Sequence, residues 1–153
     1  MHLTSSAFND GDTIPIRHTA DGPNISPALE WTGAPASAKS FALICDDPDA
    51  PRGTWVHWVL FNLPADATAL PEGVATAPTL DIGAAQGKND FRNPGYGGPS
   101  PPPGKPHRYF FRLYALDATL KLAPGCSRAD LDHAMQGHLL ASAQLMGKYG
   151  RTK

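Results

Sequence analysis

The chain has 153 residues, of which 41% are hydrophobic and 18% charged, and its formal net charge is -1. This length fits a single domain, residues 1–153, with enough core to fold without disulfide bonds. The near-zero charge excludes the broad positive surface that sequence-independent nucleic-acid binding requires, so we expect no nucleic-acid partner. The 15 glycines and 16 prolines favour many short strands and turns over long helices.

Two cysteines, Cys45 and Cys126, lie far apart in a chain that needs no covalent bond to fold, so we expect both to be free thiols. The first ten residues have neither a positive start nor an apolar stretch of signal-peptide length. No segment reaches the roughly 18 apolar residues of a membrane span. We therefore expect a cytoplasmic protein without a membrane span.

Residues 9–35 are dense in Asp, Gly, Asn and Pro, which is typical of turns. Two short β-like pieces within them, 14–16 and 28–31, predict edge strands. Residues 40–46 then form a continuous apolar run, which predicts a strand buried on both faces.

The two-residue period of that strand places four side chains on one face: Phe41, Leu43, Cys45 and Asp47. Asp47 therefore ends a core-facing row, where an unpaired carboxylate would be costly. An imidazole N–H is the simplest partner for it, and we predict that His57 supplies this group.

Residues 55–63 form a second apolar run, whose predicted alternation groups these side chains on one face: Trp55, His57, Val59, Phe61 and Leu63. The third run, 107–116, begins with His107 and Tyr109 on one face. Arg108 points to the opposite face, where we expect a surface salt bridge rather than a place in the site.

Residues 64–106 hold turns, a predicted short strand at 80–83, and a long Gly/Pro loop of the kind that is often functional. Near the C-terminus, Ser127 and Asp130 have the spacing of a capping box. Apolar residues then recur at helical spacing, which predicts one helix over residues 128–146, ending before Gly147.

Three segments, 47–51, 55–57 and 97–109, each lie at the end of a predicted strand and should meet at one site. Together they supply a carboxylate, two imidazoles, a phenol and glycine-rich backbone, which suits a small anion better than a bond-breaking reaction. A carboxylate behind an imidazole fixes its tautomer and leaves the other ring nitrogen to face a ligand. Gly97 and Gly98 could expose amides as an anion-binding nest.

Other interpretations, including purely structural roles, stay open for these residues. The segment 47–51 could be an ordinary Asp-Pro turn, and His57 could be a core histidine that donates to a backbone carbonyl. Ser100 lies in a near miss of the G-x-S-x-G motif and lacks its strand-to-helix context. A metal held by Asp47, His57 and His107 is the remaining enzymatic alternative.

Several motifs in order resemble the phosphatidylethanolamine-binding protein family, which includes the Raf kinase inhibitor protein, and more closely its bacterial branch. They are residues 21–31 (DGPNISPALEW), 46–51 (DDPDAP), 55–59 (WVHWV), 95–102 (GYGGPSPP) and 107–109 (HRY). The resemblance implies a mainly β fold, an antiparallel β-sandwich with a C-terminal helix and short peripheral helices.

The resemblance also implies a shallow pocket for phosphate-like anions and assigns residues to it. The matching pocket and rim positions are Asp47, His57, His107, Tyr109, Trp55, Pro51, Gly97, Gly98 and Pro102. It further implies no cofactor, a homodimer, and a candidate cis bond between Ala50 and Pro51.

We therefore expect a non-enzymatic binding protein for phosphate or phosphorylated head groups, with a kinase or a protease as a candidate partner that it inhibits. The alternative is a weak hydrolase that uses a metal ion or the imidazole pair.

Overall fold

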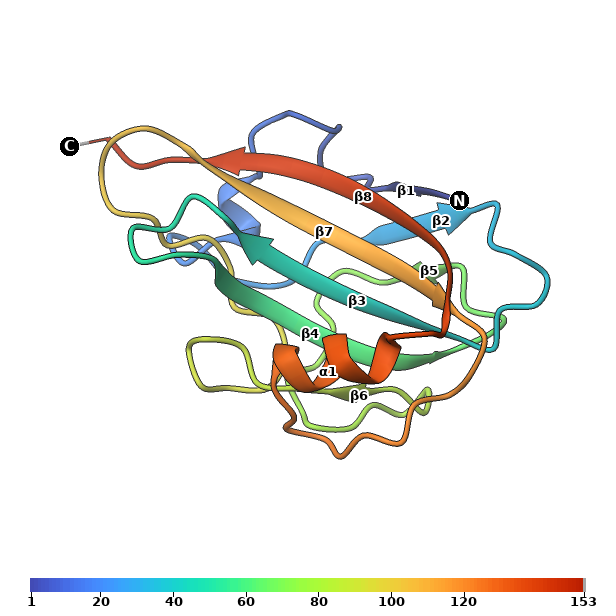
Figure 1. The fold of residues 1–153 in the computed structure, drawn as a ribbon. Coiled ribbons are helices and arrows are strands. Elements are labelled where there is room, and N and C mark those ends of the chain that lie inside the picture. Colours follow the sequence, from blue (N-terminus) through green and yellow to red (C-terminus); the bar gives the residue numbers. More distant parts are fainter. Residues whose placement is uncertain (153) are drawn as a thin grey trace.

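The computed structural model describes residues 1–152, which form two antiparallel sheets and one α-helix (Figure 1). The smaller sheet has the order β1-β2-β5, with β1 at His2–Thr4, β2 at Leu29–Thr32 and β5 at Ala69–Leu70. The larger sheet has the order β6-β4-β3-β7-β8, with β6 at Ala85–Gln86, β4 at Trp55–Pro64, β3 at Ser40–Asp47, β7 at His107–Leu116 and β8 at Leu139–Tyr149. The 3-10 helix η1 spans Ile16–His18 and α1 spans Arg128–Met135. The predicted mainly β sandwich is confirmed.

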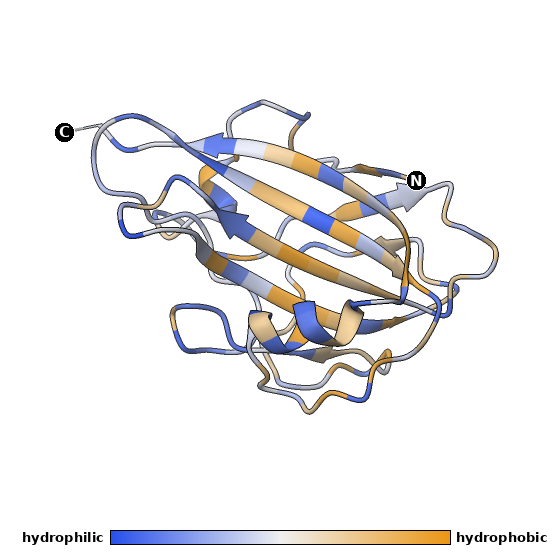
Figure 2. Cartoon of the chain, viewed as in Figure 1, coloured by the Kyte–Doolittle hydropathy of each residue, from blue (hydrophilic) through white to orange (hydrophobic). Residues whose placement is uncertain are grey.

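Strand β3 is the centre of the larger sheet, and all its residues are buried. Phe41 and Leu43 pack toward Trp31 of the smaller sheet, whereas Ile44 on the other face packs toward Leu131 of α1. The sheet is therefore covered on both faces, which explains the unbroken apolar run in the sequence. Figure 2 shows this run along β3 giving way to polar residues at the strand's end.

Strand β4 departs from strict alternation because its register with β3 shifts twice. Between Cys45 and Asp46 of β3 the register skips His57, which becomes the extra residue of a β-bulge. The second shift lies between Leu60 and Leu63, and across it Phe61 packs under α1 while Leu63 packs between the sheets. The alternation predicted for this strand is therefore wrong.

The predicted C-terminal helix begins correctly but ends early. The Ser127 side chain accepts from the Asp130 amide and the Asp130 carboxylate accepts from the Ser127 amide, so the predicted capping box is confirmed. The helix stops at Met135, before Gly137 with φ 81°. The rest of the predicted helix, 128–146, is mostly β8, which pairs with β7 along its whole length.

Of the smaller predictions, some are confirmed and others are wrong. The strand expected at 28–31 is β2, and Cys45 and Cys126 are free thiols. Residues 80–83 form a turn, not a strand, and 14–16 leads into η1. The bond between Ala50 and Pro51 is trans, so the cis expectation is wrong. Within residues 1–152, no helix has the length and apolar character to cross a membrane.

The antiparallel order brings three strand ends together. Strand β3 ends where β4 and β7 begin, at the left-hand end of the larger sheet in Figure 1. The loop that follows residue 96 returns to the same end before it enters β7. This end of the sandwich therefore collects the polar side chains that the sequence places at strand termini.

Candidate functional site

A cavity of about 220 Å³ opens at this end of the larger sheet. The predicted site residues that line it are Asp47, Pro51, Trp55, His57, Pro102, His107 and Tyr109. Residues that the sequence did not single out as binding residues complete it: Ala50, Phe91, Ser100 and Pro101. The convergence of the three segments is therefore present in the structure.

Gly97 and Gly98 lie outside this cavity, and their amides are already bonded. The Gly97 amide donates to the His57 carbonyl at 2.9 Å, and the Gly98 amide donates to Asn24 Oδ1 at 2.8 Å. A Cβ on Gly98 would overlap the His18 carbonyl oxygen, so close packing of the loop accounts for this glycine. The predicted amide nest is therefore wrong.

Asp47 pairs with His107, not with His57 as predicted. His107 Nδ1 donates to Asp47 Oδ2 at 2.7 Å, and Asp47 Oδ1 accepts from the Asp49 amide at 2.8 Å. The carboxylate holds the ring proton on Nδ1, which leaves Nε2 of His107 for a ligand. The carboxylate therefore fixes the tautomer of an imidazole as expected, but the imidazole is that of His107 and not that of His57.

His57 is held by the loop instead of by a carboxylate. Its Nδ1 donates to the Gly97 carbonyl at 2.6 Å, because a carbonyl can only accept. Burial lowers the pKa of His57, although the bond to Gly97 and the nearby Asp47 carboxylate oppose the shift. The ring is therefore neutral at pH 7, and its unprotonated Nε2 is buried without a partner.

Tyr109 presents the second unpartnered group. Its hydroxyl is buried without a hydrogen bond, and its ring lies edge-on to His57 with centroids 5.2 Å apart. Burial, helped by the Asp47 charge, raises the pKa of Tyr109 well above its usual value, so the phenol keeps its proton. Among residues 1–152, buried side-chain nitrogen or oxygen atoms without a partner occur only in Trp31, His57 and Tyr109. Two of these three residues, His57 and Tyr109, line the same cavity.

A pair of Tyr→Phe substitutions tests whether the Tyr109 hydroxyl is truly unpartnered. Tyr109→Phe removes a buried donor that has nothing to bond, so we expect the free energy of unfolding to rise by about 1 kcal/mol. Tyr96→Phe should lower it by about 1–2 kcal/mol, because the Tyr96 hydroxyl donates to the His18 carbonyl at 2.6 Å. Urea denaturation measures both, and equal losses in the two variants would contradict the assignment.

An aromatic rim borders the cavity. Trp55 and Phe91 are each 38% exposed, and their rings meet edge-on with centroids 5.5 Å apart. Asn89 holds Phe91 in place, since its Oδ1 accepts from the Phe91 amide at 2.9 Å. Sequence reasoning missed Phe91, whose signal is a large apolar residue inside a polar Gly/Asn-rich loop. The rim offers an apolar surface to the organic part of a ligand.

The same contacts bear on the metal alternative. In the part of the chain that the structure describes, no three His, Cys, Asp or Glu side chains are grouped to hold a metal ion. Asp47 and His107 are bonded to each other, and the Nδ1 of His57 is bonded to the backbone. The geometry therefore gives no support to a site with these three ligands.

The model of the family described as phosphatidylethanolamine-binding protein matches residues 4–150. The chain belongs to this family. It is 57% identical to a UPF0098 protein of Methanothermobacter thermautotrophicus over 99% of both chains, and 42% identical to YbhB of Escherichia coli over 97% of this chain and 99% of that one. The predicted resemblance is confirmed.

Solved structures of family members agree with the fold. A homologue from Chlamydia trachomatis superposes with a TM-score of 0.89 at 41% identity, covering 98% of this chain and 97% of that one. YbcL of Escherichia coli superposes with a TM-score of 0.91 at 35% identity, covering 97% of each chain. The β-sandwich of this phosphatidylethanolamine-binding protein family member is thus shared with bacterial relatives.

Proposed function

We propose that this family member is a non-enzymatic binding protein that holds a phosphate-like oxyanion, free or attached to an organic group. One observation carries the proposal: His57 and Tyr109, whose side chains each carry a buried polar atom without a partner, both line the cavity at the strand ends. Buried polar groups without partners are rare in folded proteins and are costly unless a ligand or water satisfies them. An oxyanion has several acceptor oxygens and can satisfy donors from several directions at once.

The three side chains that could donate to an anion do so in different protonation states. The Tyr109 phenol donates at any pH near neutrality, because burial raises its pKa. His107 Nε2 accepts in the neutral ring, because Asp47 holds the proton on Nδ1, and it donates only when the ring carries a second proton. His57 Nε2 donates only when the ring takes up a proton, and a bound anion would favour that proton uptake. The exposed rim would then hold the organic part of a phosphorylated molecule.

The non-enzymatic character rests on the hydrogen bonds of the site. Ser100 lines the cavity, but no hydrogen bond joins its hydroxyl to an imidazole among residues 1–152. Nucleophilic catalysis by a serine needs a base within hydrogen-bond reach of the hydroxyl. This geometry therefore gives no support to a serine-hydrolase mechanism.

The pH dependence of sulfate binding tests the proposal. Sulfate stays a dianion from about pH 5 to 8, so any change in its affinity comes from the protein. Burial lowers the pKa of free His57, whereas an anion at Nε2 raises it, so proton uptake accompanies binding. We expect affinity to increase as the pH falls through the histidine range, measured by isothermal titration calorimetry.

His57→Gln is the matched variant for this titration. Glutamine keeps a polar side chain but cannot gain a proton, so the dependence of affinity on pH should become weaker. Asp46, Asp47 and Asp90 lie near the ring and His107 lines the same cavity, and all four are unchanged in the variant, so the difference between the two profiles reports His57. A flat affinity profile for the unmodified protein would contradict the proposal.

The exposed aromatic rim supports a second candidate function. Trp55 and Phe91 form an exposed apolar edge beside the anion cavity, and aromatic residues of this kind are enriched in protein interfaces. A partner protein such as a kinase or a protease could dock there and be inhibited. Inhibition of the partner can be measured with and without saturating sulfate. If sulfate in the cavity abolishes the inhibition, the partner docks at this rim and not elsewhere on the surface.

A further inference from the structure

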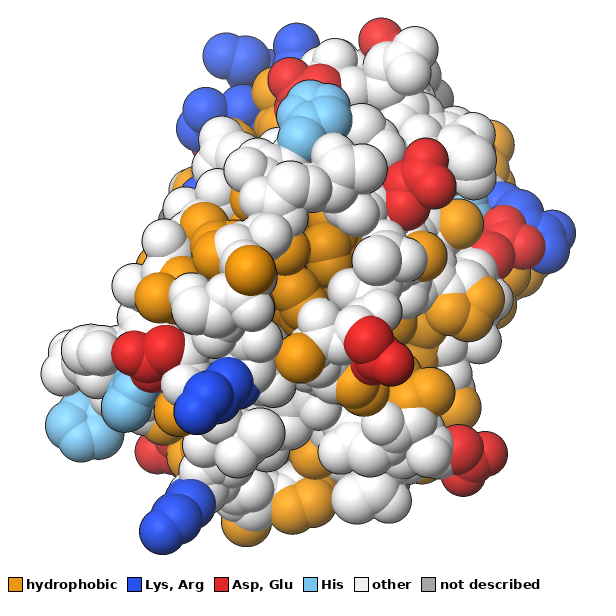
Figure 3. Space-filling model, turned by 90° about the vertical axis from the view of Figure 1, so that its right-hand side faces the viewer, with side chains coloured by type: hydrophobic (Ala, Val, Ile, Leu, Met, Phe, Trp, Pro, Cys, Tyr) orange, Lys and Arg blue, Asp and Glu red, His pale blue; other side chains and the backbone are white. Residues whose placement is uncertain are grey.

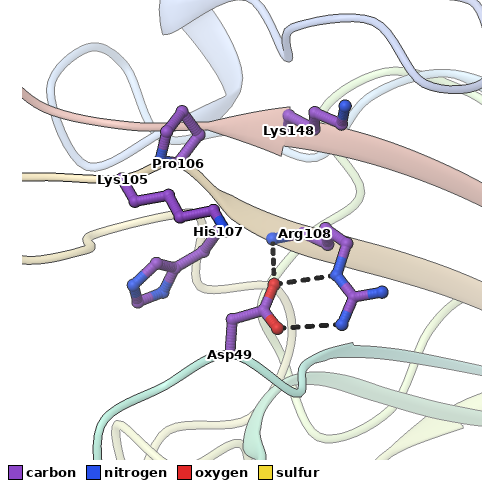
Figure 4. Close-up of a pocket in the computed structure, with 6 residues that line it drawn as sticks. All are labelled: Asp49, Lys105, Pro106, His107, Arg108 and Lys148. Atoms are coloured by element: carbon purple, nitrogen blue, oxygen red, sulfur yellow. Dashed lines mark hydrogen bonds and ion pairs between the residues drawn. The ribbon is translucent and has the colours of Figure 1, made fainter.

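A second cavity, which we call the basic groove, adjoins the anion cavity. It encloses about 500 Å³ and is lined by Asp49, Lys105, Pro106, His107, Arg108 and Lys148. His107 lines both cavities, so the two are neighbours. Figure 4 shows the residues that line the groove, with the Asp49–Arg108 pair below and Lys105 and Lys148 apart from each other above it.

One cation of the basic groove is already neutralised. Arg108 Nε and Nη2 donate to the two carboxylate oxygens of Asp49 at 2.9 Å each, and the Arg108 amide donates to the same carboxylate. These bonds lower the pKa of Asp49 to about 2, so it stays ionised. The surface ion pair predicted for Arg108 is present, and it forms a fixed wall of the groove.

The two lysines of the groove have no such partner. Neither Lys105 nor Lys148 forms an ion pair with any side chain in residues 1–152. Three cationic side chains against one carboxylate leave a surplus of two positive charges in the groove. This surplus contrasts with the net charge of -1 for the whole chain.

The sheet register makes this arrangement costly without a ligand. Lys148 of β8 lies directly opposite Arg108 of β7, and like charges opposite each other across a strand pair are destabilising. On the opposite end of the molecule, positive and negative side chains are mixed (Figure 3). An anion in the groove would remove the repulsion that Asp49 only partly offsets.

We infer that the basic groove is a second anionic subsite, and that the ligand is a small organic phosphate with a second acidic group. This inference rests on the proposed function, because the first phosphate occupies the cavity beside His57. The second group, a phosphate or a carboxylate, is bound in the groove that the two lysines line. The basic groove, at about 500 Å³, has the size of a small-molecule site, and the anion cavity, at about 220 Å³, is smaller.

A matched pair of probes tests the inference: propyl phosphate, with one anionic group, and 1,3-propanediol bisphosphate, with two. Calorimetry at about 0.15 M ionic strength, where charges beyond about 8 Å are largely screened, isolates local contacts. The unmodified protein should bind the bisphosphate at least tenfold more tightly, which exceeds the twofold statistical advantage of two equivalent ends. Lys105→Gln/Lys148→Gln should reduce this advantage to about twofold and change propyl phosphate affinity by less than threefold.

Lys39→Gln/Lys121→Gln is the control with the same change in charge. Lys39 precedes β3 and Lys121 follows β7, so both lie at the far end of the sheet and should leave both affinities unchanged. If both double variants lowered the affinities for both probes equally, the effect would come from the overall charge of the protein. That result would overturn the inference. An advantage seen only with a phosphopeptide bearing an acidic residue would overturn the assignment to a small molecule.

The experiment gives different results if the proposed subsite is wrong and if the proposed function is wrong. If propyl phosphate binds and the bisphosphate gains no more than twofold, the groove is not a subsite but the anion cavity stands. If neither probe binds the unmodified protein, the anion cavity itself is refuted, and the subsite with it.

Discussion

Replacing His107 with asparagine should weaken sulfate or phosphate binding about 10- to 100-fold while the fold stays intact. The asparagine amide can donate to Asp47 as the ring Nδ1 does, so the buried carboxylate keeps a partner. Nothing replaces Nε2, the atom that we propose contacts the ligand. A hydrogen bond to a charged group contributes about 1.5–3 kcal/mol, which corresponds to this range of affinity. Trp55 fluorescence can report the titration, because that ring borders the cavity.

The chain contains a matched control for this substitution. His138 Nδ1 contacts Asp117 Oδ1 at 2.8 Å, but both side chains are exposed and lie outside the cavity lining. His138→Asn should therefore leave anion affinity unchanged. Wild-type affinity in His107→Asn would remove His107 from the site, and unfolding of that variant in urea well below the wild-type midpoint would show that asparagine does not satisfy Asp47.

The convergence of the site could be predicted because strand ends in an antiparallel sheet are fixed by the strands themselves. The apolar runs that became β3, β4 and β7 are long and continuous, and each ends or begins with polar residues. Once the runs pair, Asp47, His57 and His107 must lie at one end of the sheet. The sequence carries that information locally.

The partners within the site could not be predicted in the same way. The choice of Asp47 between two imidazoles depends on the bulge at His57, which no two-residue period reveals. The bulge leaves His57 within reach of the Gly97 carbonyl instead. The role of the Gly97–Gly98 loop likewise depends on which distant groups it packs against, here Asn24 and the backbone of His18.

Strand β8 shows a second limit of sequence reasoning. Its apolar residues fit helical spacing nearly as well as strand spacing, and the capping box upstream favours the helix. The strand forms because β7 offers a free edge that accepts pairing along its whole length. This edge is a tertiary feature, and it overrides the local preference after Gly137.

Asp46, the neighbour of Asp47 on the other face of β3, should be among the most sensitive positions for stability. Its buried carboxylate accepts from Arg112 at 3.1 Å and from Arg128 at 2.8 Å, and so ties α1 to the sheet. Asp46→Asn keeps the shape but removes the charge between two guanidinium groups. Breaking a buried ion pair costs about 3–5 kcal/mol, and we expect the lower end because both arginines are partly exposed.

Asp132→Asn is the control, because Asp132 contacts Arg128 at 3.1 Å from an exposed position. It should lower the free energy of unfolding by less than about 1 kcal/mol, as is usual for surface pairs. Urea denaturation of the two variants separates the buried charge from the helical pair. If Asp46→Asn were as stable as the wild type, the position of α1 would depend on the packing of Leu131 and Met135 alone, and the paired arginines would contribute nothing to holding it.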